Sequence, residues 1–179
     1  MTLSPNDLHA EGCSVYAVAA FYVRPDRLIS RLLKAVESVG GVILDVDEEN
    51  RVVRCTVSAG GLRRLSKEAG DLLSTAGVEV KVTCRWRGEF REKLKDLARR
   101  GFLVERGEGR AICYGVVEGR YVEVEFEGGE RVKIKVGRRT PVKSKRLTHK
   151  PPPSAYIMNL DESLEAVGEA LRVAGAVLG

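Results

Sequence analysis

Four apolar strand segments alternate with two amphipathic helices over residues 13–86, and this order constrains the fold more than any other feature of the chain. The apolar run 15–23 is typical of a buried strand, and residues 78–86 alternate strictly between apolar and polar, as a strand with one buried face does. Leucines and valines at helical spacing follow Asp26, which is a good N-cap residue. The predicted strands are 15–23, 42–46, 51–57 and 78–86, and the predicted helices are 26–39 and 62–76.

This βαββαβ order, with its short connections, favours an antiparallel four-stranded sheet with both helices on one face. The arrangement resembles the ferredoxin-like fold, which serves many unrelated functions. We therefore predict an α+β protein with a ferredoxin-like domain over residues 13–86. Trp86 alternates in phase with Val78 and Cys84, so we expect its ring to be largely buried.

The second part of the chain is predicted as a helix and a small antiparallel β-meander over residues 87–137. Its last hairpin is expected to turn through Glu127-Gly128-Gly129, which sets Val124 opposite Val132 and Glu125 opposite Arg131. That register places apolar residues on one face and opposite charges on the other. The remaining segments are a basic, proline-rich connector at 138–158 and an amphipathic helix at 159–179, with Asn159 and Glu162 at capping-box spacing.

The composition is typical of a hyperthermophile protein. The chain has no Gln, three Asn and 31% charged residues, which is the bias expected when thermolabile amides are replaced by charge. No segment resembles a targeting signal, and the nine-residue apolar run is too short to span a bilayer. These features predict a cytoplasmic protein without a membrane segment.

The chemistry-bearing residues are few. The four cysteines are far apart in sequence and the two histidines are His9 and His149, so the close ligand pairs of a structural zinc site are missing. Four buried thiols are expected, with a disulfide as the alternative that hyperthermophile proteins allow. GxSxG, HExxH and GxGxxG are also absent, so we predict no metal, no cofactor and no enzymatic activity.

Positive charge is concentrated in one segment, because residues 131–150 hold nine basic side chains and no acidic one. The open face of the predicted sheet would add aromatic and basic side chains, which in such folds stack bases and hold phosphates. This combination predicts a non-enzymatic nucleic-acid-binding protein, with RNA favoured over DNA. The candidate residues are Tyr16, Tyr22, Arg54, Lys81 and Arg85 on the sheet, and Arg138, Arg139, Lys143, Lys145 and Arg146 in the connector.

Other interpretations stay open at this stage. Residues 51–57 lack the paired aromatics of the RNA-recognition family, so the sheet face could instead be buried in a homodimer. The glycines of Ser58-Ala59-Gly60-Gly61 would then lie at a helix N-terminus, where backbone amides can hold an anion. The alternatives are a homodimeric, small-molecule-binding regulatory domain and an accessory subunit of a larger complex, with the C-terminal helix as a further contact for a second copy or another protein.

Overall fold

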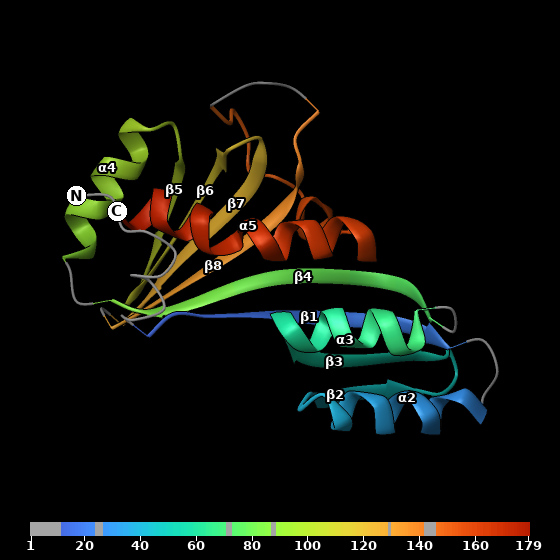
Figure 1. Ribbon diagram of the computed structural model, residues 1–179. Coiled ribbons are helices and arrows are strands. Elements are labelled where there is room, and N and C mark those ends of the chain that lie inside the picture. Colours follow the sequence, from blue (N-terminus) through green and yellow to red (C-terminus); the bar gives the residue numbers. More distant parts are fainter. Residues whose placement is uncertain (1–11, 24–26, 71–72, 87–88, 129, 142–145) are drawn as a thin grey trace.

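The structure is a computed structural model of the chain, and it describes all residues except 1–11, 24–26, 71–72, 87–88, 129 and 142–145 (Figure 1). The elements are β1 (Ser14–Val23), α2 (Arg27–Ser38), β2 (Val42–Asp47), β3 (Val52–Ser58), α3 (Ala59–Ala69), β4 (Leu73–Arg85), α4 (Phe90–Arg99), β5 (Leu103–Gly107), β6 (Arg110–Val117), β7 (Arg120–Glu127), β8 (Arg131–Arg139), the 3-10 helix η1 (Pro153–Tyr156) and α5 (Leu160–Leu178).

The described strands form one antiparallel sheet of eight strands, in the order β2-β3-β1-β4-β8-β7-β6-β5. The predicted α+β class is confirmed. The 13-residue strand β4 pairs with β1 along one side and with β8 along the other, so the sheet continues across the predicted boundary after residue 86. The division into a domain at 13–86 and a second part at 87–137 therefore stays a prediction.

Helices α2, α3 and α5 lie on one face of the sheet (Figure 1). The faces follow from the strand alternation, because Ala17, Ala19 and Phe21 of β1 point into the core beneath the helices while their neighbours point to the opposite face. We call the face beneath the helices the helix face and the other the open face. The small Ala17 and Ala19 side chains leave room for the helices at the centre of the sheet.

One serine cap and one asparagine cap determine where two of the helices begin. Ser58 Oγ accepts a hydrogen bond from the Gly61 amide at 3.0 Å, and Asn159 Oδ1 accepts one from the Glu162 amide at 2.8 Å. The Asn159 cap agrees with the predicted start of the last helix. The predicted helix 62–76 is wrong at both ends, because the Ser58 cap starts α3 at Ala59 and because Ser74 and Thr75 pair with β1 as part of β4.

The β7–β8 hairpin is shifted by two residues from its predicted register. Val124 lies opposite Ile134 and Phe126 opposite Val132, so the turn occupies residues 128–130. A shift of two keeps every side chain on its predicted face. In this register Phe126 pairs with Val132, and its buried ring has its centroid 6.2 Å from that of Trp86. Trp86 packs against the core with most of its surface buried, as its alternation with the buried residues of the strand predicted.

The predicted connector is in part a packed element. Helix η1 buries Ala155 and Tyr156 on the open face, against Tyr114 and Tyr121. Gly137 permits this close approach, because a Cβ there would lie 2.5 Å from the Ala155 carbonyl oxygen. Met158 then bridges to Val78 of β4, and α5 continues on the helix face. Residues 138–158 therefore carry the chain from one face of the sheet to the other.

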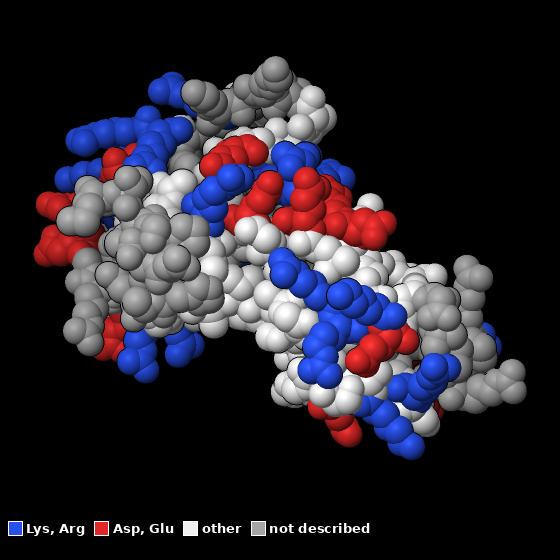
Figure 2. Space-filling model, viewed as in Figure 1, with Lys and Arg blue, Asp and Glu red and all other residues white. Residues whose placement is uncertain are grey.

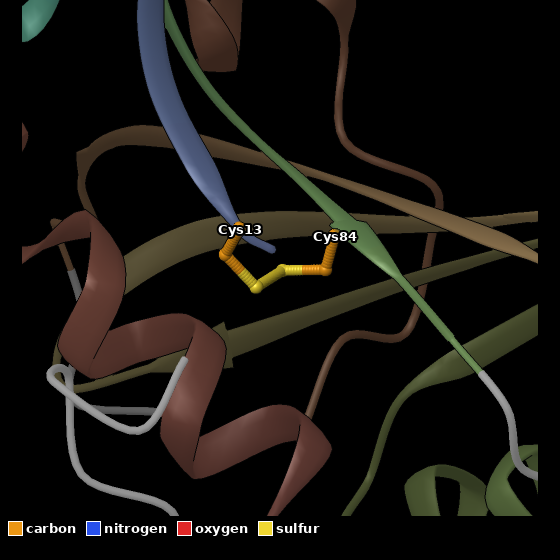
Figure 3. Close-up of a disulfide and its surroundings, with 2 residues drawn as sticks. All are labelled: Cys13 and Cys84. Carbon is orange, nitrogen blue, oxygen red and sulfur yellow. A yellow bond between two sulfur atoms is a disulfide. The ribbon is translucent and has the colours of Figure 1, made fainter. Parts of the chain in front are cut away.

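A disulfide joins Cys13 to Cys84, where β1 begins and β4 ends (Figure 3). The expectation of four buried thiols is wrong for this pair and right for Cys55 and Cys113, which are free and fully buried. Burial raises the pKa of Cys55 to about 11 and that of Cys113 to about 12, so both stay protonated and unreactive at neutral pH.

We predict that replacing Cys13 and Cys84 together by Ser lowers the free energy of unfolding by about 4 kcal/mol, because the bond closes a loop of 71 residues in the unfolded chain. Denaturant titration of the parent and the double variant measures this difference. A reductant should destabilise the parent alone. Equal midpoints for the two proteins without reductant would show that the bond contributes nothing.

Candidate functional site

The five predicted sheet residues all lie on the open face, because each is out of phase with the buried side chains of its strand. Tyr22, Arg54 and Arg85 are exposed, and Tyr16 and Lys81 are half-buried opposite each other in the β1–β4 ladder. Tyr16 accepts a hydrogen bond from the Thr83 hydroxyl at 3.5 Å.

Of the predicted connector residues, the structure describes Arg138, Arg139 and Arg146. Arg138 is exposed at the end of β8, whereas Arg139 pairs with Glu165 and Glu169 of α5 at 3.0 and 3.5 Å. The hydrogen bond that Arg139 donates to Glu165 raises the pKa of Arg139 further above its ordinary value. Arg146 is exposed and has interactions of its own, and Lys143 and Lys145 lie outside the described residues.

Most basic side chains of the central strands are matched by carboxylates across the open face. Figure 2 shows the same mixing of basic and acidic side chains around α5. In the last hairpin Lys133 is paired, while Arg131, which was expected opposite Glu125, has no carboxylate within 4.0 Å among the described residues. The pairs are Lys81–Glu79 (3.5 Å), Lys133–Glu127 (3.1 Å), Lys135–Glu123 (3.4 Å) and Arg110–Glu125 (2.7 Å).

A fully buried arginine attaches α5 to the sheet. Arg120 Nε donates to Glu169 at 2.9 Å and Nη1 donates to the Gly137 carbonyl at 3.2 Å. Its Nη2 lies 3.5 Å from Glu165, without hydrogen-bond geometry. The hydrogen bond from Arg120 lowers the pKa of Glu169. Nothing in the sequence singled out Arg120, because its partners are 45 and 49 positions away.

One part of the open face is uncovered and apolar. Tyr22, Val42, Leu44 and Ile157 are the large apolar side chains that the described residues expose, at 46, 60, 52 and 43%, and all four lie there. Ile157 sits over Gly77, where a Cβ would come within 2.7 Å of it. We call this region, with the half-buried apolar side chains between the four, the bare surface: Val18, Ala20, Tyr22, Val42, Leu44, Val52 and Ile157.

The ladder registers show that the bare surface is continuous across four strands. Its rows run Val42–Thr56–Val18–Glu79, then Asp45–Arg54–Ala20–Gly77, then Asp47–Val52–Tyr22–Ser74. Leu44 is the extra residue of a bulge between Ile43 and Asp45. The sequence analysis missed Val42 and Leu44, although three consecutive apolar residues on a strand require one side chain to leave the core face.

Two cavities lie on either side of Trp86. One, of about 590 Å³, is lined by Arg85, Trp86, Glu127, Gly128, Glu130 and Arg131. The other, of about 630 Å³, is lined by Trp86, charged side chains of α4 and Leu178. The indole N–H of Trp86 is buried and has no acceptor among the described residues.

Within the described part of the chain, no cluster of three or more His, Cys, Asp or Glu side chains could hold a metal ion. The Gly61 amide at the start of α3 is already bonded to Ser58, so the predicted anion site at the glycine turn has one donor fewer. No described helix combines the length and the apolar character needed to cross a bilayer.

No protein-family model matches the chain, and no curated protein matches it. Two solved structures are similar at a low level. The α and β subunits of aspartokinase are 12% identical, with a TM-score of 0.24 and coverage of 94% of this chain and 93% of that one. The regulatory subunit of aspartate kinase from Thermus flavus is 11% identical, with a TM-score of 0.22 and 93% coverage of both chains. Likeness at this level carries no argument about this chain.

The prediction of a nucleic-acid-binding protein is wrong. The structure supplies the physical reason. Carboxylates neutralise Lys81 and Arg139, so the described residues do not gather the predicted basic side chains into one unpaired basic surface. A polyanion site needs clustered, unpaired positive charge.

We predict that Glu169→Gln lowers the free energy of unfolding by about 3 kcal/mol at pH 7, because it leaves buried Arg120 with a weaker partner. The lowered pKa of Glu169 gives stability that is present above the ordinary value of 4.5 and is lost as pH falls through the folded-state value. The gap between variant and parent should therefore narrow below pH 4.5 in denaturant titrations. Glu68→Gln on the exposed side of α3 is the control. If the difference in unfolding free energy between variant and parent is the same at every pH, the ion pair between Arg120 and Glu169 is contradicted.

Proposed function

We propose that the protein is a homodimeric, small-molecule-binding regulatory domain in which a second copy covers the bare surface. The observation that carries this proposal is the gathering of all four exposed large apolar side chains on one face of half the sheet. Apolar patches of this kind on a soluble protein mark sites of association.

The other half of the same face supports this interpretation by contrast. There the chain covers its own sheet, since Tyr156 and Ala155 pack over Tyr114 and Tyr121. Over β2, β3 and β1 the described residues provide no such layer. A second copy supplies one, because two open sheet faces pack together in the same way as the layers of a sandwich.

Charge complementarity favours a second copy over an unrelated partner. Arg54 and Asp45 are both exposed and lie opposite each other in the β2–β3 ladder, within the bare surface. Neither side chain forms an ion pair within the part of the chain that the structure describes. In a two-fold dimer the same patch meets itself, so Arg54 of one copy can pair with Asp45 of the other, twice. The two copies thus present the same kind of sheet face to each other, with complementary charges.

The small-molecule part of the proposal is supported by the cavities beside Trp86. They lie at the far end of β4 from Ser74, which neighbours Tyr22, so a ligand there does not compete with the dimer surface. Cavities of roughly 300–1,000 Å³ are the usual size for small-molecule sites.

The dimer is tested by adding charge to the bare surface. Tyr22→Lys with Ile157→Lys should shift the protein from dimer to monomer in sedimentation velocity, because four lysines would then be buried in each dimer. Both side chains are exposed, so the fold should survive, and circular dichroism checks this. Ala98→Lys, on an exposed position of α4, is the matched control and should leave the dimer intact. A parent protein that sediments as a monomer at every concentration tested would overturn the proposal.

A charge reversal tests how the two copies meet. Arg54→Asp alone should weaken the dimer by about tenfold, since it sets like charges against each other. Arg54→Asp combined with Asp45→Arg should restore it, because the swapped charges attract again. A double variant as weak as the single one would show that these residues do not face each other across the interface.

A further inference from the structure

The structure assigns a binding site for a small carboxylate anion to the cavity formed by Arg85, Arg131 and Trp86. This inference gives the ligand class and position for the small-molecule binding in the proposed function, and rests on that function only in this respect. It does not require the dimer.

Two unpaired arginines face each other in this cavity. Arg85 and Arg131 are direct partners in the β4–β8 ladder, and both are exposed. Neither has a carboxylate within 4.0 Å among the described residues, although the neighbouring lysines of β8 are matched. Like charges directly opposite each other in a sheet destabilise it. An anion held between the two guanidinium groups would remove that repulsion.

The acid that could have neutralised Arg131 is used elsewhere. Glu127 lies opposite Arg131 in the β7–β8 ladder, but its carboxylate pairs with Lys133 at 3.1 Å. Glu130 also lines the cavity, and its carbonyl oxygen accepts a hydrogen bond from the Trp86 amide at 2.8 Å. That bond holds the backbone of Trp86 beside the residue that precedes Arg131.

The chemistry of the lining selects the ligand. Guanidinium groups bind planar carboxylates through paired hydrogen bonds, and two on adjacent strands can share one anion. The indole of Trp86 adds an apolar wall, together with an N–H that lacks an acceptor among the described residues. Glu127 and Glu130 line the same cavity and repel extended polyanions. The site therefore fits a small carboxylate with an apolar or aromatic group.

Trp86 is the single tryptophan of the chain, so its fluorescence reports on this cavity directly. The probe is benzoate, with neutral benzamide as its isostere and inorganic phosphate as a tetrahedral anion. Benzoate should change the emission saturably and raise the melting temperature, while benzamide should do neither. A response to phosphate without one to benzoate, or no saturable response to benzoate, would overturn the inference.

Arg85→Gln and Arg131→Gln should each weaken benzoate binding at least tenfold, since each removes a charge-assisted hydrogen bond. Arg106→Gln, an exposed arginine of β5, is the matched control and should bind as the parent does. Without ligand, Arg131→Gln should be at least as stable as the parent, because the repulsion is gone. A less stable variant would instead indicate a structural partner and would overturn the site.

Sedimentation of the same variants separates this inference from the proposed dimer. Arg85→Gln and Arg131→Gln should remain dimers, since neither residue belongs to the bare surface. If the protein is a dimer but does not bind benzoate, only the proposed carboxylate site is overturned. If the protein binds benzoate but is a monomer, the proposed dimer is overturned and the carboxylate site is supported.

Discussion

The length of β4 is the constraint on which the rest of the structure depends. Its 13 residues pair with β1 along one edge, while residues 80–85 of the other edge pair with β8 and Val78 pairs with Met158. Without the second edge the chain would form two small sheets, each with a further exposed edge. With it, one helix face extends under α2, α3 and α5, and the buried side chains of both halves form one core cluster. The Cys13–Cys84 disulfide closes the end of this strand against β1.

A buried charge determines how the C-terminal helix closes that core. The connector crosses the plane of the sheet beside β4, and α5 then returns over β4 and β8. Arg120 is fully buried beneath it and donates hydrogen bonds to Glu169 and the Gly137 carbonyl, so displacing α5 would leave a buried charge without its carboxylate partner. Apolar packing of Val173 and Val177 alone would allow the helix to slide. The ion pair therefore supplies specificity where the hydrophobic contacts supply most of the stability.

At the two proposed binding surfaces, side chains lack the packing or ion-pair partners that similar side chains have elsewhere in the structure. Elsewhere on the open face, acids match lysines across the strands and η1 covers the aromatic side chains. Among the described residues, no segment covers the bare surface, and no carboxylate pairs with Arg85 or Arg131. Such local departures in an otherwise consistent structure are where binding is expected. The bare surface and the cavity beside Arg85 and Arg131 lie at opposite ends of β4, so a ligand and a second copy can bind at the same time.

The sequence by itself determined the elements and the faces of the strands. Alternation in residues 78–86 and helical spacing after Asp26 depend on neighbours along the chain, and they predicted the α+β class and most strands. The same local information failed where a distant partner decides the outcome. Residues 74–75 joined a strand because β1 lies beside them, and the β7–β8 register differs by two although both registers place the same side chains on each face. The pairing of Arg139 with Glu165 was equally invisible, so a basic segment in the sequence was mistaken for a free one. Tertiary structure decided which charges are neutralised and which apolar side chains remain uncovered, because both depend on contacts between residues far apart in the chain.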